Sequence, residues 1–226
     1  MTNLSETDSN GADLRVVAID GPAGSGKSTV GKLLATRLGL TYLDTGAMYR
    51  GVAFAALIQG ADLGDIDLVG QIARDVDLSV TESGVLVDGI DATTQIRGPE
   101  VSAAVSAVAA NSQVRDELRK RQRDWAKAHG GGVIEGRDIG SVVFPDALLK
   151  VYLTADPEVR ASRRAAEIGA EDAGAVANDM ARRDAADTKR SDSPLVEPDG
   201  AVTIDSTDLE IDAVVELVAD LVGARS

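Results

Sequence analysis

Short runs of branched apolar residues alternate with helical patterns along most of the chain. The run 14–20 is rich in valine and is followed at once by Gly-Pro, which predicts a buried strand. A glycine-rich loop comes next, and apolar residues then recur at helical spacing over 29–38, up to Gly39. A second short strand at 40–43 leads into a helix that continues to Ile58. This order of strand, loop and helix predicts a parallel sheet flanked by helices.

The pattern changes in the middle of the chain. The segments 77–80 and 85–88 alternate apolar and polar residues and are separated by a Glu-Ser-Gly turn. They predict a small antiparallel hairpin, with a third strand near 92–96. A helical stretch follows from 99 to 128. The hairpin is therefore expected to be an insert in a parallel scaffold.

The second half returns to strands and helices in turn. Strands are predicted at 132–135, 148–153 and 201–205, and an amphipathic helix at 211–222 closes the chain. The segment 159–190 is polar, rich in Asp and Arg and poor in large apolar residues. We expect it to be the most mobile ordered part, acting as a lid.

Composition narrows the class of protein. The 226 residues are 44% apolar, enough for one core, and the formal charge of −14 argues against nucleic acid or an anionic membrane as a partner. With no cysteine and a single histidine, neither a disulfide framework nor a transition-metal cluster is expected. Residues 1–13 are polar and acidic and lack the apolar stretch of a signal peptide, so we expect a disordered tail on a cytoplasmic protein.

A phosphate-binding loop is the clearest chemical signal. The run GPAGSGKS matches G-x-x-x-x-G-K-[ST] without a gap and lies between a predicted strand and helix. Its glycines let backbone N–H groups turn around a phosphate, Lys27 would reach the β and γ oxygens of ATP, and the Ser28 hydroxyl would bind Mg²⁺. The expected ATP-binding residues of this loop are Gly21, Pro22, Ala23, Gly24, Ser25, Gly26, Lys27, Ser28 and Thr29.

The loop alone does not decide the reaction, because many classes of nucleotide-binding protein use it. A GTPase would carry an N-K-x-D segment to read guanine, and the sequence contains none. A kinase acting on CMP, UMP, AMP or a metabolite such as shikimate stays possible on this ground. So does a nucleotide-dependent switch or binding module that hydrolyses ATP slowly.

Further motifs carry a more specific resemblance. The segments IDGPAGSGKST, LDTGAMYR, EGRDIGSVVFPDA and RRDAADTKR and the late Asp-Ser-Thr occur in the order found in bacterial cytidylate kinases, from about Val16 onward. The chain resembles that family, although Glu135 stands where aspartate is more frequent. The resemblance implies an α/β P-loop fold, ATP as phosphoryl donor and CMP or dCMP as acceptor, in pyrimidine nucleotide metabolism. We expect a monomer.

Arginines are the side chains expected to offset the repulsion between two anionic substrates, because the planar guanidinium matches phosphate oxygens. By resemblance, Arg50 and Arg137 hold the CMP phosphate and Arg190 lies where the two phosphates meet. An isolated arginine is more often part of a surface salt bridge. Here three arginines follow separate predicted elements, and Lys27, Arg137 and Arg190 are the expected catalytic residues.

The base is expected to be read by hydrogen bonds. The resemblance puts Asp138, Arg115 and Ser106 around cytosine, with the carboxylate accepting from the ring amine that uracil lacks. Ser106 could equally be a small residue of an alanine-rich helix. Thr45 and Tyr49 should line the acceptor pocket, although Tyr49 could equally be a packed core aromatic.

The lid supplies the remaining candidates. Arg183 and Asp187 lie four residues apart and could grip the ribose hydroxyls together, or they could form a routine i,i+4 ion pair. Arg160 and Arg163, with Arg164, are expected to close over ATP and expel water.

The expected division of the chain follows from these motifs. The P-loop core comprises 14–65, 116–158 and 191–226, the CMP-binding lobe with its β-hairpin is 66–115, and the lid is 159–190.

Overall fold

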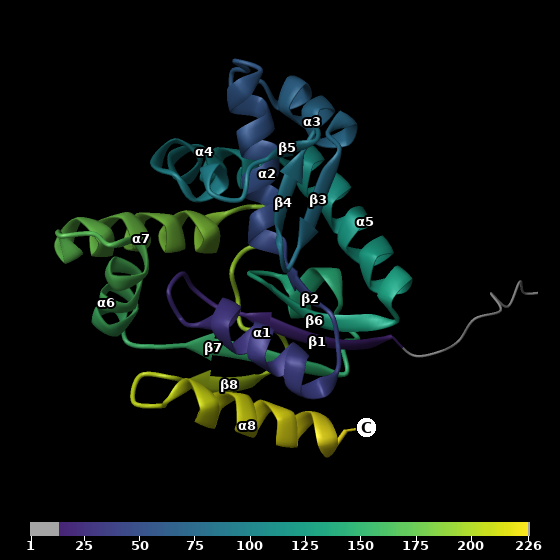
Figure 1. The fold of residues 1–226 in the computed structure, drawn as a ribbon, viewed down its shortest axis with the longest axis vertical. Coiled ribbons are helices and arrows are strands. Elements are labelled where there is room, and N and C mark those ends of the chain that lie inside the picture. Colours follow the sequence, from purple (N-terminus) through teal and green to yellow (C-terminus); the bar gives the residue numbers. More distant parts are fainter. Residues whose placement is uncertain (1–13, 226) are drawn as a thin grey trace, which may run out of the picture.

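The computed structural model describes residues 14–225, so the predicted tail 1–13 lies outside the described residues. The chain forms a five-stranded sheet and a separate three-stranded sheet (Figure 1). The strands are β1 Arg15–Asp20, β2 Tyr42–Asp44, β3 Leu78–Thr81, β4 Gly84–Val87, β5 Ile90–Asp91, β6 Gly131–Gly136, β7 Leu149–Thr154 and β8 Val202–Asp205. The α-helices are α1 Lys27–Leu38, α2 Thr45–Ile58, α3 Ile66–Asp75, α4 Pro99–Ala110, α5 Ser112–His129, α6 Pro157–Ile168, α7 Ala173–Lys189 and α8 Ile211–Gly223.

The larger sheet confirms the predicted α/β class. Its strand order is β2-β6-β1-β7-β8, and every neighbouring pair is parallel. Because the strands are parallel, their carboxyl ends meet at one edge, and the loops that follow them lie together. The phosphate loop follows β1, the turn that carries Arg137 follows β6, and the α2 residues follow β2.

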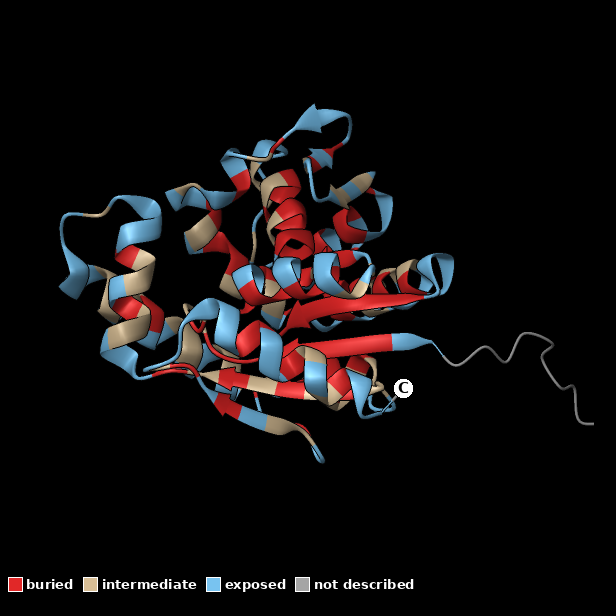
Figure 2. Ribbon diagram, turned by 60° about the horizontal axis from the view of Figure 1, so that its bottom comes forward, coloured by how far each residue is buried: buried red, intermediate tan, exposed pale blue. Residues whose placement is uncertain are grey.

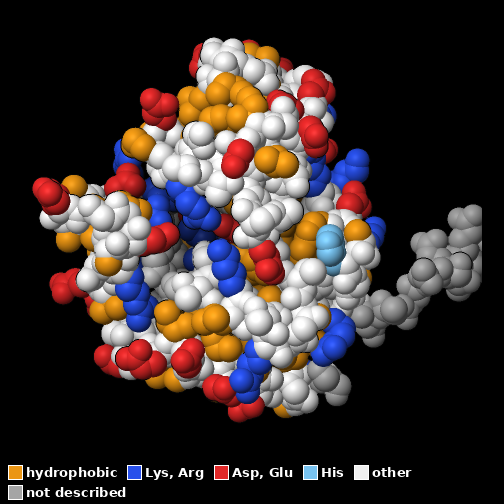
Figure 3. Space-filling model, viewed as in Figure 1, with side chains coloured by type: hydrophobic (Ala, Val, Ile, Leu, Met, Phe, Trp, Pro, Cys, Tyr) orange, Lys and Arg blue, Asp and Glu red, His pale blue; other side chains and the backbone are white. Residues whose placement is uncertain are grey.

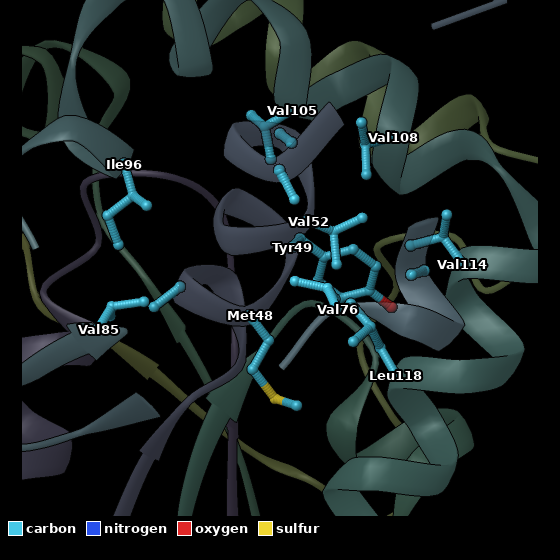
Figure 4. Close-up of a cluster of buried hydrophobic side chains, with 14 of the residues drawn as sticks. Met48, Tyr49, Val52, Val76, Val85, Ile96, Val105, Val108, Val114 and Leu118 are labelled. Atoms are coloured by element: carbon cyan, nitrogen blue, oxygen red, sulfur yellow. The ribbon is translucent and has the colours of Figure 1, made fainter. Parts of the chain in front are cut away.

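Alternate side chains of β1 fill the cores on the two faces of this sheet. Val17 and Ile19 pack with α1 and α8 on one face, and Val16 and Ala18 belong to the cluster with α2 and α5 on the other. Figure 2 shows the buried residues concentrated on the strands and on the inner sides of the helices. Figure 4 shows the second cluster, in which Tyr49 of α2 lies among side chains of α4 and α5. The sheet and α2 thereby form one rigid base for the loops.

The small antiparallel sheet confirms the predicted hairpin but not its third strand. The predicted strand at 92–96 is wrong, because β5 is Ile90–Asp91 and the residues Gln95–Arg97 form a 3-10 helix. The Asp91 carboxylate accepts from the Thr93 backbone N–H at 3.0 Å, and this local turn ends the strand. A hydrogen bond from a side chain to the local backbone therefore competes with strand formation at the start of the predicted segment.

The predicted helical stretch 99–128 is two helices rather than one. Asn111 separates α4 from α5, and its side chain accepts from the backbone N–H groups of Gln113 and Val114, which caps α5. Helix α3 has no counterpart in the sequence prediction. It is capped by Asp65 and buries Val69 and Ile72 against the core.

Helices α6 and α7 pack against each other and form an arm that projects from the sheet (Figure 1). Few of its side chains are buried, namely Ala161, Ala165 and Met180. Within residues 14–225 no helix has both the length and the apolar character needed to cross a membrane.

Candidate active site

A cleft of about 410 Å³ opens at the carboxyl edge of the parallel sheet, a size suited to a small-molecule ligand. Figure 3 shows Lys and Arg side chains gathered around this hollow, beside the arm. Most residues predicted for the site line it: Ala23, Gly24, Ser25, Gly26, Lys27, Ser28, Thr29, Thr45, Tyr49, Arg50, Ser106, Arg115, Arg137, Asp138, Arg163, Arg183, Asp187 and Arg190. Gly21, Pro22 and Arg160 lie outside the lining. The fold therefore brings residues from distant parts of the chain to one place.

The phosphate loop connects β1 to α1 as its motif requires. Gly24 and Gly26 have φ of 71° and 92°, a left-handed conformation that glycine adopts without strain. A Cβ on Gly24 would also lie 2.7 Å from the Met180 side chain and 2.8 Å from the Arg160 carbonyl. Helix α1 begins at Lys27, so its positive N-terminal end faces the cleft. This geometry is suited to an anion.

Lys27 is buried at the base of the loop. Its Nζ donates to the Pro22 carbonyl at 2.7 Å and lies 3.4 Å from Ser25 Oγ. Burial and, next, the charge of Arg137 together lower the pKa of Lys27 to about 7, although the charges of Glu135 and Asp184 act in the opposite direction. An arriving phosphate would supply the negative charge that favours the protonated amine.

Asp20 ends β1 and is fully buried beneath the cleft. Its carboxylate accepts from the backbone N–H groups of Ile139 at 2.8 Å and Gly140 at 2.7 Å. Burial raises the pKa of Asp20 to about 6, although the two hydrogen bonds act in the opposite direction. These bonds fasten the turn after β6, which carries Arg137 and Asp138, to the strand that enters the phosphate loop.

Glu135, near the end of β6, is a buried carboxylate that was not predicted as a site residue. It accepts a hydrogen bond from the Tyr42 hydroxyl, and its backbone carbonyl accepts from Thr45 Oγ1 at 2.6 Å. Burial and the nearby charge of Asp44 raise the pKa of Glu135. Its place beside Arg137 in the sequence was the signal available, because strand ends in parallel sheets carry site residues.

Arg50, Arg137 and Arg190 line the cleft from different elements. Arg50 of α2 donates to the Ile96 carbonyl at 2.8 Å and to Ser102 Oγ at 3.0 Å. Burial lowers the pKa of Arg50 to about 10, with the charges of Arg183 and Arg164 acting in the same direction. Because these cations repel one another, a bound anion would be stabilised here.

The other two arginines share one carboxylate. Arg137 Nε lies 3.1 Å from Asp187, and Arg190 lies 3.5 Å from the same side chain. Arg190 also donates to the carbonyls of Asp192 and Ser193. Asp187 thus pairs with these two rather than with Arg183, which lies 4.0 Å from Asp179. The routine i,i+4 pair was therefore the wrong alternative for Asp187.

A buried ion pair occupies the far wall of the cleft. Asp138 accepts from Arg115, and their side chains are 6% and 1% exposed. The Arg115 guanidinium lies over the Tyr49 ring at 5.4 Å from its centre, and Arg115 Nε has no hydrogen-bond partner among the described residues. Tyr49 packs in the core and also lines the cleft, so the two predicted positions for this residue are both correct. Ser106 lines the same wall.

The arm contributes side chains with different partners. Arg163 donates to Ser206 Oγ at 3.0 Å and to its carbonyl at 2.7 Å, and Arg164 lies 2.8 Å from Glu167. Both arginines line the cleft. Arg160 instead donates to the Ala23 carbonyl at 2.8 Å and to Asp184 at 2.6 Å. Arg97, Asp44 and Glu135 line the cleft too but were not predicted as site residues.

The cleft also has oxygen donors suited to Mg²⁺. Ser28, Asp44 and Glu135 all line it. Among residues 14–225 no group of three or more His, Cys, Asp or Glu side chains could hold a metal ion. Magnesium commonly uses one or two carboxylates together with substrate phosphates rather than a protein cage. The residues present therefore fit that ion better than a metal that needs a full set of protein ligands.

Comparisons with known proteins agree with this geometry. A family model described as cytidylate kinase matches residues 17–224. A cytidylate kinase of Streptomyces griseus is 46% identical over 215 residues, covering 93% of this chain and 93% of that protein. One of Mycobacterium avium is 47% identical over 220 residues and covers 93% and 96%. An uncharacterized protein from Eubacterium ventriosum, 13% identical, covers 94% and 99% with a TM-score of 0.50, a likeness of fold alone.

Proposed function

The chain belongs to the cytidylate kinase family, and we propose on this basis that it transfers the γ-phosphoryl group of ATP to CMP or dCMP, giving ADP and CDP or dCDP. One observation carries the proposal beyond the family: a phosphate loop and a converging set of arginines share a single cleft with a buried carboxylate–guanidinium pair. The first two suit a pair of phosphorylated substrates, and the third suits a base with an amine.

The phosphate loop is the proposed ATP end. Backbone N–H groups of the loop and the start of α1 receive the phosphates, and Lys27 turns from the Pro22 carbonyl to the β and γ oxygens. Arg163, which lines the cleft beside Ser206, is placed to contact the nucleotide from the arm. Ser28 and Glu135, which line this end of the cleft, would hold Mg²⁺ together with the phosphates, and the ion would supply positive charge to them.

The acceptor end holds CMP. Arg50, Arg137 and Arg190 offset the charge of its phosphate, with Thr45 beside them. Asp138 accepts from the cytosine amine while Arg115 donates to the ring. Such a site disfavours uracil, because its buried polar groups would be left unpaired.

Three further residues complete the acceptor pocket in this proposal. Ser106 lies beside the base, and Arg183 and Asp187 contact the ribose hydroxyls. Asp187 already accepts from Arg137, so it also connects the ribose contact to the phosphate contact.

The transfer needs positioning and charge neutralisation more than a proton acceptor. A phosphate oxygen of CMP, already ionised because the second phosphate pKa is about 6, forms a bond to the γ phosphorus. The bond from that phosphorus to the bridging oxygen breaks, and the electron pair leaves with ADP. Arg137, Arg190 and Lys27 stabilise the charge on the transferring group and on the leaving oxygen.

The division into parts remains a proposal. We assign 66–115 to the CMP-binding lobe. We assign 159–190 to a lid, and this second assignment is supported by the small number of buried side chains in α6 and α7. The boundary at 115 falls within the continuous helix α5, so any hinge would have to lie nearer Asn111. We also propose that the enzyme acts in the cytoplasm as a monomer, with small-molecule substrates and neither nucleic acid nor membrane as partner.

Measuring ADP formation with CMP, dCMP, UMP, AMP and shikimate as acceptors tests the function. CMP and dCMP should stimulate it strongly, and the other three weakly. If another acceptor is preferred, the proposed function is wrong and that acceptor is the substrate. ATP hydrolysis that CMP leaves unchanged would favour the switch or binding module instead.

A further inference from the structure

The arm formed by α6 and α7 is hydrogen-bonded to the backbone of the phosphate loop at Ala23. The Ala23 backbone N–H donates to the Asp184 carboxylate at 3.1 Å, and the Ala23 carbonyl accepts from Arg160 at 2.8 Å. Arg160 and Asp184 in turn form an ion pair at 2.6 Å. Donor and acceptor of the same residue are therefore both satisfied by the arm, one by each of its helices.

Packing around this contact leaves little freedom. The Arg160 and Asp184 side chains are 12% and 16% exposed, and Arg160 Nε also donates to the Ala155 carbonyl at 3.1 Å. Met180, the buried side chain of α7, lies where a Cβ on Gly24 would be. The loop conformation and the position of the arm thus depend on each other.

The sequence suggested that Arg160 would contact ATP, together with Arg163. We infer instead that Arg160 and Asp184 are positioning residues for the proposed reaction: they hold the Ala23 peptide of the phosphate loop under the arm, and Arg160 acts through this contact rather than by binding ATP. This inference rests on the proposed function only where it uses turnover as a readout.

Charge makes the two members of the pair unequal. Asp184 is close enough to Lys27 for its charge to raise the pKa of that amine, so the carboxylate also lies near the place expected for the phosphates. Paired with Arg160 it adds no net charge there. Removal of Arg160 alone would leave an unbalanced carboxylate that repels ATP, whereas removal of Asp184 alone would leave a cation that does not.

The test is a double-mutant cycle of Arg160→Gln, Asp184→Asn and the combined variant, with the KM for ATP, the KM for CMP and the dissociation constant of ADP by calorimetry. Arg160→Gln should weaken ATP and ADP binding about 30-fold and Asp184→Asn about threefold. The combined variant should recover to about fivefold, because the repelling carboxylate is gone. The KM for CMP should stay within about twofold throughout.

A matched control lies on α7, the helix that carries Asp184. Arg182, 75% exposed, pairs with Asp179 at 2.6 Å, and Arg182→Gln should leave all three constants unchanged. If the combined variant binds ADP as weakly as Arg160→Gln or more weakly, Arg160 contacts the nucleotide itself and the inference is wrong. Equal losses for ATP and CMP would also overturn it, since they would indicate a general loss of structure. If the unaltered protein fails to phosphorylate CMP, the proposed function is wrong, and the ADP measurements still decide the inference.

Discussion

The two ends of the cleft are built by different means. The ATP end is one continuous loop whose backbone N–H groups, glycine conformations and helix terminus lie within 21–28. The CMP end is assembled from side chains of α2, α4, α5, α7 and the turn after β6. The loop lies between one strand and one helix that adjoin it in the sequence, with the arm packed on it at Ala23, whereas the dispersed set needs elements from across the fold. We therefore expect changes at the ATP end to act on all acceptors alike and changes at the CMP end to act on selectivity.

Lys27→Ala should give the largest loss, because it removes the buried amine that we propose contacts the β and γ phosphates of ATP. We expect kcat to fall about 10³-fold with CMP, dCMP and UMP equally. Steady-state rates with the three acceptors would check this, alongside circular dichroism of the purified variant. Activity above a tenth of the original with any acceptor would show that the amine is dispensable.

Asp138→Asn should change selectivity instead. An asparagine amide can donate to the uracil carbonyl where the carboxylate accepted from the cytosine amine, so the ratio of kcat/KM for CMP over UMP should fall about 10²-fold. The loss of charge also leaves Arg115 buried without its partner and should lower the free energy of unfolding by about 3 kcal/mol, measured by urea titration.

The control for this change is Asp187→Asn, at the same end of the cleft. Asp187 pairs with Arg137 and Arg190 and is assigned to the ribose. This variant should raise the KM for CMP and for UMP and leave the ratio of their kcat/KM values within about twofold of the original. If the ratio of kcat/KM for CMP over UMP falls equally in both variants, Asp138 does not recognise the base.

Proton uptake should be the smallest of the three effects. The pKa of Lys27 is lowered to about 7 by burial without nucleotide, so at pH 8 most of the amines are neutral. Bound phosphate raises this pKa, and ATP binding at pH 8 should take up about one proton. Calorimetry in buffers of different ionisation enthalpy measures the uptake. The part due to Lys27 is the excess over the Lys27→Ala variant, and this excess should be nearly absent at pH 5.5, where the amine is already protonated. The same uptake in Lys27→Ala would assign the proton to another group.

The contrast between the two ends also explains what the sequence could predict. The loop motif and the strands around it depend on local patterns, and the structure places them as expected. The predicted strand at 92–96 failed because a side-chain turn at Asp91 competed with β propensity. Helix α3 was overlooked, although Asp65 and the spacing of Val69 and Ile72 are the ordinary signals of a capped amphipathic helix.

The dispersed end was predictable only through resemblance. Nothing local to Asp138 indicates that Arg115, 23 residues earlier, would be its partner, because their meeting depends on how α5 crosses the sheet. Likewise the sequence could place Arg160 on a charged helix but not distinguish a contact to ATP from a contact to the Ala23 peptide. Such choices are made by packing between elements.

Asp20 has one more consequence. Its two hydrogen bonds fix the turn that carries Arg137 and Asp138 to the strand beneath the phosphate loop. If the acceptor lobe moves, Ser106 moves with α4. Arg137 and Asp138, which we propose contact the phosphate and the base of CMP, then stay fixed with respect to ATP. The attacking oxygen would then be aimed by the immobile half of the enzyme, and closure would determine how long CMP stays rather than where it points.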